Sequence, residues 1–522
     1  MGGCDDTLGF IRKHYLSGSA ASCGGSPCLA TNVDTVDPDA TYDYDLAVIG
    51  GGSGGLACAK AAAEAGARVV LFDFVKPSPA GTTWGLGGTC VNVGCIPKKL
   101  YHQAALLGEG LHDARTFGWD LPEHATNSWG MLRQGIQDHI GSLNFGYRVT
   151  LRDKGVTYKN TLASFIDAHT LKTVDKRGRE GSLTAARTVI AVGGRPHTLD
   201  IPGGDLAITS DDVFSMTTAP GKTLVVGASY VALECAGFLT GLGYDTTVAV
   251  RSILLRGFDR ECADMIGEYM AEHGTRFLMK TQPKSIERTE AGKLKVTMTA
   301  TAEDGSESEL VEEYDTVMAA TGRYADTAGL NLDAVGVATT RSGHIKHTNE
   351  QTSCPNIYAI GDILEGGMEL TPVAIQAGKL LAARLFKGDT VPMDYTKIAT
   401  AVFTPLEYGS VGLSEEAAKE KYESVTVYHQ FFTPLEWTVA HRGENKGYVK
   451  AIVDDVSNVV VGLHYLGPVA GEVIQGFGAA VKQGLTFDML IDTVGIHPVC
   501  AEQFTTLHIV KGSGVSALSS GC

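Results

Sequence analysis

Two stretches of the chain repeat one order of apolar and polar positions. In the first, an apolar run at 44–49 is followed by a glycine-rich turn at 50–55, an alanine-rich segment at 56–65 and a second apolar run at 68–73. Short, uninterrupted apolar runs beside glycine are typical of strands buried in a parallel sheet. The order strand, turn, helix, strand therefore predicts a βαβ unit.

The same order returns later in the chain. An apolar run at 222–226 leads through a tight turn into a helical segment from Tyr230, and the next strand is expected at 247–250. Two short strands that end in glycine, 189–192 and 317–320, lie on either side of this unit. We expect them to carry the chain between two domains, each built on one βαβ unit.

The remaining pattern is different. The stretch 280–315 is polar and alternating, which predicts an antiparallel ribbon attached to the second unit. From residue 396 onward the positions alternate as in strands, and a helix is predicted over 471–483. A third domain is expected to begin there.

Composition and charge limit the class of protein. The chain has 522 residues, a formal net charge of −16 and a hydrophobic share of 44%, which suits about three compact domains. The acidic balance argues against nucleic acid or an anionic membrane as a partner. No apolar run reaches the roughly 18 residues of a membrane span. The first residues lack the features of a signal peptide, so we expect a cytoplasmic protein, with a mitochondrial location left open.

The first turn carries a dinucleotide fingerprint. Gly50, Gly52 and Gly55 satisfy G-x-G-x-x-G, with Ser53 between them, and Asp73 follows about twenty residues on, where an acid would hold a ribose hydroxyl. The glycines let a pyrophosphate approach the amides at the helix N-terminus. The alternative is a glycine-rich turn without a ligand, which the complete βαβ unit disfavours.

The second turn has different chemistry. Gly227 and Ser229 lie in the turn, but the strand after it is followed by Arg251 and Arg256 in place of an acid. A basic residue at this offset accommodates a 2′-phosphate, which selects NADPH over NADH. Solvated arginines are the alternative for either residue alone. Two nucleotide sites on one chain imply a flavin in the first and a nicotinamide in the second.

A pair of cysteines follows the first fingerprint. Cys90 and Cys95, with four residues between them, are preceded by Gly-Gly-Thr89 and followed by Ile-Pro-Lys98-Lys99. Lysines beside a thiol favour the thiolate, which is the reactive form. The pair is therefore suited to a disulfide that opens and closes. No metal site is predicted.

Several motifs together resemble a known family. The chain resembles the FAD-dependent disulfide reductases of the glutathione reductase family and, within it, the high-molecular-weight thioredoxin reductases, from about residue 43 to 510. The broad family is marked by Gly88–Cys95. The thioredoxin reductase branch is marked by Trp84–Leu86, Lys98–Ala105, Gly227–Gly237 and Val250–Gly257.

This resemblance implies an α/β fold with two Rossmann-like dinucleotide-binding domains plus an α+β dimer-interface domain. FAD and NADPH are the implied cofactors. Asp362, which follows a strand at 357–360, is placed to meet the ribityl hydroxyls of the flavin. The implied parts are an FAD-binding domain at 44–200 and 329–395, an NADPH-binding domain at 201–328, an interface domain at 396–510 and a redox tail at 511–522.

The resemblance also assigns roles around the disulfide. Cys95 is the expected flavin-proximal sulfur and Cys90 the exchanging one. Lys98 is expected to pair with Glu234 beside the isoalloxazine ring, and Tyr230 to shield the face that receives hydride. Thr89 is expected among the flavin-binding residues.

A histidine and an acid near the end complete the implied site. On the residues alone, two interpretations of His497 are equally well supported: a histidine at a domain surface, or a base that Glu502 orients. In the family motif both come from the second subunit, and His497 returns the proton that keeps the outgoing thiol reactive. The implied enzyme is a head-to-tail homodimer.

Both ends of the chain extend the resemblance. The tail ends in Gly521-Cys522, like the C-terminal redox arm that reduces thioredoxin, and we expect a selenocysteine to follow Cys522; a free terminal cysteine is the alternative. Residues 1–20 resemble the end of a glutaredoxin, and 21–43 would be a linker. That layout is similar to thioredoxin-glutathione reductases, with glutathione or glutaredoxin as a further partner.

Two other functions stay open. A glutathione reductase is disfavoured by the tail and by the Trp84 and Tyr101-His102 signatures. A truncated FAD- and NADPH-binding protein without thioredoxin reduction is the second alternative.

Overall fold

The first pattern folds into a βαβ unit in the computed structural model, which describes residues 40–122 and 125–518. β1 (Tyr44–Ile49) leads into α2 (Ser53–Glu64), and β2 (Val69–Phe72) lies parallel to β1. The helix begins three residues before the predicted start, because two of the turn glycines already belong to its first turn. The predictions for 1–39 and for Cys522 lie outside the described residues.

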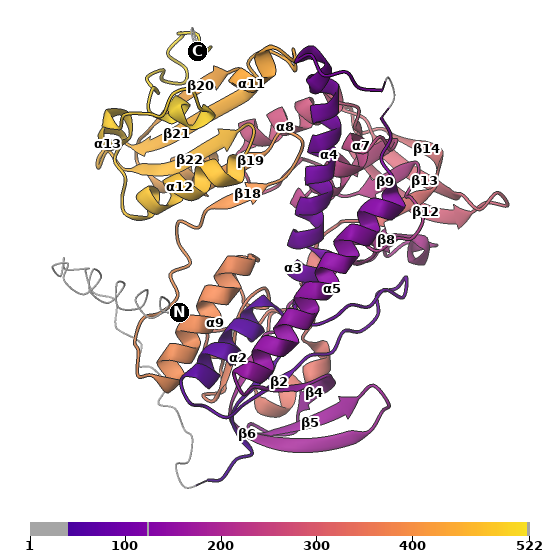
Figure 1. Ribbon diagram of the computed structural model, residues 1–522, viewed down its shortest axis with the longest axis vertical. Helices are drawn as coiled ribbons and strands as arrows, with labels where there is room; N and C mark the ends of the chain where they lie inside the picture. The colour runs from indigo at the N-terminus through magenta and orange to yellow at the C-terminus, as the bar shows by residue number, and fades with distance from the viewer. Residues whose placement is uncertain (1–39, 123–124, 519–522) are drawn as a thin grey trace. The chain divides into compact units, whose positions relative to one another are not determined.

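A sheet in the order β3-β2-β1-β6-β5-β4 holds this unit, with β17 paired to β6. Alternate residues of β1 face opposite sides: Leu46 and Val48 pack with α2 and α9, and Ala47 packs on the side of β4 and β5. Helix α9 lies beside α2 (Figure 1) because Gly378 brings it against the backbone of Gly54. The remaining elements of this layer are β3 (Thr157–Lys159), β4 (Thr161–Phe165), β5 (Thr170–Asp175), β6 (Glu180–Ile190), β17 (Ile357–Ala359) and α9 (Thr371–Phe386).

Three helices carry the cysteine segment away from this sheet. Cys90 lies in α3 (Gly88–Val93), and Cys95 is the first residue of α4 (Cys95–Thr116). Together with α5 (Trp129–Asp153), α4 runs from the first sheet towards the other two parts of the protein (Figure 1). The cysteines therefore lie where the first sheet meets the rest of the fold.

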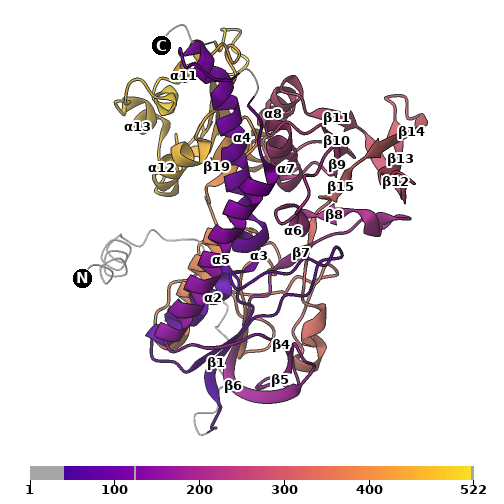
Figure 2. The same cartoon turned by 45° about the vertical axis from the view of Figure 1, so that its right-hand side comes forward.

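The second pattern forms a parallel sheet in the order β11-β10-β9-β15-β8. The predicted ribbon at 280–315 is confirmed as the antiparallel strands β12, β13 and β14, which project from this unit (Figure 2). The elements are β8 (Ile208–Thr209), α6 (Ser210–Val213), β9 (Thr223–Val226), α7 (Tyr230–Gly241), β10 (Thr246–Val250), α8 (Arg260–Glu272), β11 (Arg276–Met279), β12 (Thr281–Arg288), β13 (Leu294–Thr301), β14 (Glu307–Tyr314) and β15 (Thr316–Ala319).

The chain passes between the two nucleotide units through a small antiparallel pair. β7 (Gly194–Pro196) pairs with β16 (Arg323–Ala325), directly after the two strands that were expected to carry the crossing. Short 3-10 helices lie near these crossings, at Gly204–Leu206, Ala328–Leu330 and Leu332–Val335.

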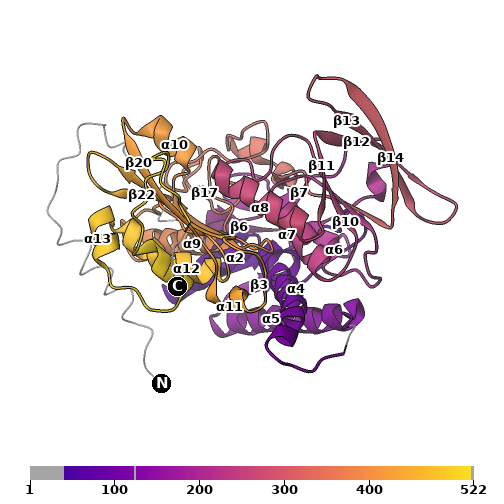
Figure 3. The same ribbon diagram turned by 90° about the horizontal axis from the view of Figure 1, so that it is seen from above.

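The third part is an antiparallel sheet in the order β18-β19-β22-β21-β20 with helices beside it (Figure 3). The predicted helix at 471–483 is present as α12. The elements are β18 (Thr400–Val402), β19 (Tyr408–Gly412), α10 (Glu415–Lys421), β20 (Val425–Phe432), α11 (Leu435–Thr438), β21 (Gly447–Asp454), β22 (Val460–Leu466), α12 (Ala470–Lys482), α13 (Phe487–Asp492) and a 3-10 helix at Cys500–Phe504.

The edge strand β20 is covered by the end of the chain. The amide of His429 donates to the carbonyl of Ile509 at 3.0 Å, and that of Phe431 donates to Ala517 at 2.8 Å. A turn between these contacts uses Gly512 and Gly514 at positive φ. The described part of the tail thus satisfies an otherwise open sheet edge.

These elements confirm the predicted α/β fold with two Rossmann-like units and a further α+β domain. The exact domain boundaries stay predictions. Across the part of the chain that the structure describes, no helix combines the length and the apolar character needed to cross a membrane.

We expect Gly55→Ala to destabilise the first unit strongly. A Cβ at residue 55 would lie 1.9 Å from the carbonyl oxygen of Gly50. Relief of this clash would require the backbone of the glycine turn or of α2 to shift. Overpacking costs about 1–3 kcal/mol or more, and the close backbone contact places this site at the upper end. The free energy of unfolding in urea measures the loss.

The matched control is Gly141→Ala on the exposed face of α5, where a Cβ meets nothing within 4 Å. That change should stabilise the protein by about 0.5–1 kcal/mol through helix propensity. Equal effects of the two substitutions would contradict the steric argument.

Candidate active site

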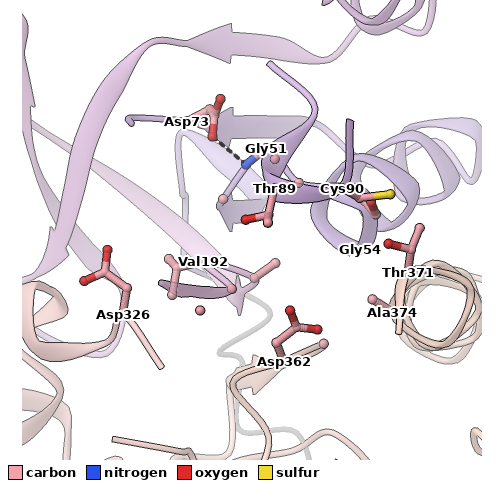
Figure 4. A pocket seen from close by; sticks show the side chains of 18 of the residues that line it. Gly51, Gly54, Asp73, Thr89, Cys90, Val192, Asp326, Asp362, Thr371 and Ala374 are labelled. Carbon is pink, nitrogen blue, oxygen red and sulfur yellow. Dashed lines mark hydrogen bonds between the residues drawn. The ribbon is translucent and has the colours of Figure 1, made fainter. Parts of the chain in front are cut away.

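A cleft opens at the carboxyl ends of β1 and β2 (Figure 4), with an empty volume of about 820 Å³ that includes space open to solvent. Ligands of open α/β sheets bind at this end of the strands. The predicted residues that line it are Gly50, Gly52, Ser53, Asp73, Thr89, Cys90 and Asp362. Gly55 does not line it but lies beneath, against Gly50.

One end of the cleft is built from the glycine turn and Asp73. The amide of Gly51 donates to Asp73 Oδ1 at 3.0 Å, and burial raises the pKa of this carboxyl to about 6. Gly50 has φ +116°, and a Cβ there would meet the Ala191 carbonyl oxygen at 2.2 Å. Helix α2 begins without a side-chain cap. The partly buried Asp73 carboxylate could bind a ribose hydroxyl, and the free amides at the start of α2 could bind a pyrophosphate.

The other end of the cleft contains Thr89, Cys90 and Asp362. Asp362 follows β17, and burial, with the nearby Glu369, raises the pKa of its carboxyl. Thr371 opens α9 and points towards Cys90 in Figure 4. A long dinucleotide in this cleft would therefore end beside a thiol.

The two thiols differ in acidity. A hydrogen bond from Cys90 is the main reason that the pKa of Cys95 is lowered to about 6, and the charge of Lys98 adds to it. Donating that bond, together with burial, raises the pKa of Cys90. Cys95 is exposed, and its Sγ lies 3.8 Å from Thr371 Oγ1, whereas Cys90 is the thiol that lines the cleft. The individual roles expected for the two sulfurs stay predictions.

Lys98 and Glu234 form the expected pair. Lys98 Nζ donates to Glu234 Oε1 at 2.8 Å, and the same oxygen accepts the Phe403 amide at 2.8 Å. The Lys98 ammonium also lies 4.6 Å from the centre of the Phe403 ring. Glu234 is buried, so its charge depends on these partners.

The second glycine turn has the same backbone conformation as the first at its leading glycine. Gly227 has φ +128°, and a Cβ there would meet the Ala320 carbonyl oxygen at 2.2 Å. Ser229 precedes α7 and makes no side-chain cap. Tyr230 opens α7; it is half-buried and does not line the first cleft.

The two arginines behind this turn are exposed. They follow β10, and Arg256 Nη2 donates to Ser252 Oγ at 2.8 Å. Exposed guanidinium groups at this position suit a phosphate monoester that arrives from solvent.

His497 and Glu502 lie elsewhere. His497 Nδ1 is 2.9 Å from Glu502 Oε2, which leaves the other ring nitrogen to face outward. Both residues line a second hollow, whose empty volume of about 890 Å³ also includes space open to solvent, and it shares no lining residue with the first cleft. Within one chain, therefore, the acid–base pair and the thiols do not form one site.

The sequence matches a family pattern over most of its length. Residues 44–378 match the pyridine nucleotide-disulphide oxidoreductases, and residues 398–508 match the dimerisation domain of those proteins. The chain belongs to the pyridine nucleotide-disulphide oxidoreductase family.

Two relatives are similar over nearly the full length. Thioredoxin reductase SEP1 of Emiliania huxleyi is 54% identical over 497 residues, which cover 92% of this chain and 99% of the relative. Mitochondrial thioredoxin reductase 2 of Drosophila melanogaster is 52% identical over 524 aligned residues, covering 99% of each chain.

As a pyridine nucleotide-disulphide oxidoreductase, this protein is an NADPH-dependent flavoprotein disulfide reductase that uses FAD. The first cleft fits the flavin dinucleotide in its glycine cradle, its uncapped helix and its acid. In residues 40–122 and 125–518, no group of three or more His, Cys, Asp or Glu side chains could hold a metal ion.

The sequence patterns missed several lining residues of the first cleft. Arg195 stacks on Trp84 at 4.8 Å and is held by Asp211, with 3.0 Å between Nε and Oδ2. Asp326 and Thr371 line the same cleft. Only the Gly-Gly-Arg-Pro that ends the 189–192 strand offered a signal, and it was read as a crossing between domains.

We expect the alkylation of reduced protein to follow the acidity of Cys95. The rate at Cys95 should rise with pH around 6, because the thiolate forms there, whereas Cys90 should react only at higher pH. Lys98→Met should move the Cys95 profile to higher pH, since it removes the nearby positive charge and leaves Glu234 unpaired. Iodoacetamide labelling read by peptide mass spectrometry measures both rates.

The matched control is Lys60→Met. Lys60 lies on α2, with its Nζ 5.9 Å from the centre of the Tyr147 ring, and contacts neither thiol. Identical Cys95 profiles in Lys98→Met and the parent would contradict the electrostatic account.

Proposed function

We propose that this reductase is a homodimer that transfers electrons from NADPH to thioredoxin through Cys90, Cys95 and Cys522. The observation that carries the proposal is the acidic Cys95 thiol beside Lys98, next to a cleft built for a dinucleotide. We infer thioredoxin as the substrate because both relatives are thioredoxin reductases.

The cofactors are assigned to residues of the two turns. When bound, FAD supplies the two-electron carrier between NADPH and the disulfide. The proposed FAD-binding residues are Gly50, Gly52, Ser53, Gly55, Asp73, Thr89, Lys98 and Asp362. The proposed NADPH-binding residues are Gly227, Ser229, Tyr230, Glu234, Arg251 and Arg256. The proposed domains are 44–200 with 329–395 for FAD, 201–328 for NADPH and 396–510 for the interface.

The chain's own groups would manage charge at the disulfide. Two electrons and one proton open the Cys90–Cys95 disulfide and leave one thiolate and one thiol. Lys98 and the Cys90 hydrogen bond stabilise the thiolate at Cys95, so the proton stays on Cys90. A base must remove that proton before Cys90 can attack a further disulfide.

A second subunit would supply the base. His497, oriented by Glu502, is the candidate, and it lines a cavity separate from the thiols of its own chain. Val494 and Ile496, just before the histidine, are 93% and 75% exposed, as expected for apolar groups that a partner covers. The matched dimerisation domain supports the same arrangement.

The tail is the proposed exit for electrons. Cys522 lies outside the described residues. Bonded to the selenocysteine expected after it, Cys522 would be attacked by the Cys90 thiolate of the partner subunit, which releases the selenolate and forms a mixed disulfide. Cys95 then closes the Cys90–Cys95 disulfide and frees the Cys522 thiol, and the reduced tail passes two electrons to the disulfide of thioredoxin. Glutathione or glutaredoxin as a further partner, a following selenocysteine and the cytoplasmic location remain predictions from the sequence.

The function is tested by NADPH oxidation with thioredoxin or oxidised glutathione as the acceptor. We expect turnover with thioredoxin and little with glutathione. His497→Gln should lower thioredoxin turnover by about 10²–10⁴, the usual size of a general-base contribution, without changing the rate at which NADPH bleaches the flavin.

His508→Gln is the matched control, an exposed histidine of the same segment whose Nδ1 lies 2.9 Å from the Thr506 carbonyl oxygen. Faster turnover with glutathione would favour a glutathione reductase. Flavin reduction without turnover of either acceptor would favour the truncated flavoprotein.

A separate experiment tests the coenzyme. We expect Arg251→Ala with Arg256→Ala to raise the KM for NADPH by about a hundredfold or more, because each of the two lost charge-assisted hydrogen bonds costs about 1.5–3 kcal/mol. The KM for NADH should stay unchanged, since NADH lacks the 2′-phosphate. Arg288→Ala, on the exposed ribbon of the same unit, is the control. A parallel rise for both coenzymes would remove these arginines from the 2′-phosphate site.

A further inference from the structure

Lys511 is the first residue of the predicted C-terminal tail, and its ammonium group lies in a cluster of three carboxylates. We call Asp259, Glu261 and Glu415 the carboxylate cluster. Lys511 Nζ lies 3.0 Å from Glu261 Oε2 and 2.8 Å from Glu415 Oε2. The first residue of the tail is thus bound by two charge-assisted hydrogen bonds, which are stronger than neutral hydrogen bonds.

The carboxylate cluster joins two parts of the protein. Asp259 caps α8 of the nucleotide unit by accepting the Cys262 amide at 3.2 Å. Its other oxygen accepts the amide of Glu415, the first residue of α10 in the C-terminal domain, at 3.0 Å. Lys511 is therefore bound where α8 of the nucleotide unit meets α10 of the C-terminal domain.

A second lysine in the carboxylate cluster explains why Lys511 is needed there. Lys450, fully buried on β21, lies 2.8 Å from Asp259, 2.7 Å from Glu261 and 3.0 Å from Glu415. Despite burial, the hydrogen bonds to Lys419, Lys511 and Lys450 lower the pKa of Glu415 to about 2, and the charge of Lys450 lowers the pKa of Asp259 and of Glu261 as well. The cluster is therefore ionised at neutral pH. One lysine cannot balance three carboxylates, and a buried charge without a partner is costly. Lys511 and Lys419, whose Nζ lies 2.7 Å from Glu415 Oε1, supply the other two positive charges.

Backbone contacts hold the same segment. The amide of Lys511 donates to the Val427 carbonyl at 2.8 Å, next to the His429 contact with Ile509 on the edge of β20. Both the side chain and the main chain of Lys511 are therefore committed. The segment stays on the edge of β20 as far as Ala517, whose carbonyl accepts the Phe431 amide at 2.8 Å. Cys522 follows Ala517 by five residues, and an extended chain of that length spans at most about 16–18 Å.

We propose that Lys511 is a positioning residue: its contacts with the carboxylate cluster fix the point from which the Cys522-bearing segment reaches its disulfide partners. The inference rests on the proposed function, because it assigns a task to the tail. Lys511 adds no chemical step; its contacts hold in place the segment of β20-bound chain from which Cys522 extends.

The first test measures attachment alone. Three variants of the full chain are compared: Lys511→Met, Lys511→Arg and Lys446→Met. Lys446 is the matched control, since it also links the C-terminal domain to α8, at 2.6 Å from Glu272, with nearly the same exposure as Lys511. Hydrogen exchange is followed by mass spectrometry in the peptides that contain 425–432 and 509–518.

We expect exchange in both peptides to be at least about tenfold faster in Lys511→Met. Lys511→Arg should restore protection, and Lys446→Met should exchange as the parent does. A single thermal unfolding transition in Lys511→Met, with a midpoint lowered because the carboxylate cluster loses a partner, shows that the rest of the fold is intact. Parent-like exchange in Lys511→Met would overturn the proposal.

The second test measures delivery without thioredoxin. Cys522 is converted to a mixed disulfide with 2-nitro-5-thiobenzoate, and NADPH then supplies the two electrons that release this thiolate and leave the Cys522 thiol. We expect release in Lys511→Met to be at least about tenfold slower, near the parent rate in Lys511→Arg, and unchanged in Lys446→Met. The rate of flavin reduction should be the same in all four proteins.

The outcomes separate the two proposals. Faster exchange with unchanged release would make Lys511 purely structural and overturn its positioning role. Release that depends on Lys511, in a parent protein that fails to reduce thioredoxin, would overturn the proposed function and leave the positioning role standing.

Discussion

One buried carboxylate, that of Glu234, connects all three parts of the protein. Its Oε1 accepts a hydrogen bond from Lys98 on the cysteine-bearing helix and another from the Phe403 amide beside β18, while Glu234 itself belongs to α7 of the nucleotide unit. A buried charge is stable only with its full set of partners, so a shift of any one part would leave it uncompensated. The position of the thiols relative to the second nucleotide turn depends on this contact.

The same device appears at two other junctions. Glu407 accepts His102 Nε2 at 2.8 Å and, through its second oxygen, the amide of Ala470 at the start of α12. Asp259 joins the starts of α8 and α10 in the same way. Glu234 and Asp259 each satisfy a backbone amide of another part, whereas Glu407 satisfies an amide of its own part and crosses to α4 through His102. These contacts lie beside an apolar cluster that also spans the parts, through Tyr101, Phe238 and Tyr408. Packing thus brings the parts together, and the acids specify how they are oriented.

How far the sequence could be read depended on the range of each contact. The strands at 44–49 and 247–250 and the ribbon at 280–315 were predicted because period and turn residues are local signals. The start of α2 was placed late, because glycines were taken to end the turn when two of them belong to the helix. Arg195 and Trp84, more than a hundred residues apart in the chain, were not connected, since nothing local shows that a guanidinium stacks on that ring. Lys450 was missed for the same reason: in sequence it is one lysine of an alternating strand.

The sequence by itself determined the class of chemistry. Spacing and residue type around the glycine turns, Cys90 and Cys95 are sufficient, because dinucleotide binding and thiol exchange each need particular residues within a short stretch of chain. Only the tertiary structure decided which thiol is acidic, which residues complete the first cleft and where the tail is attached. Those properties arise from distances between groups far apart in the chain, such as Lys511 and Glu261, and from the loss of solvent around them. Both come into existence only when the parts pack together.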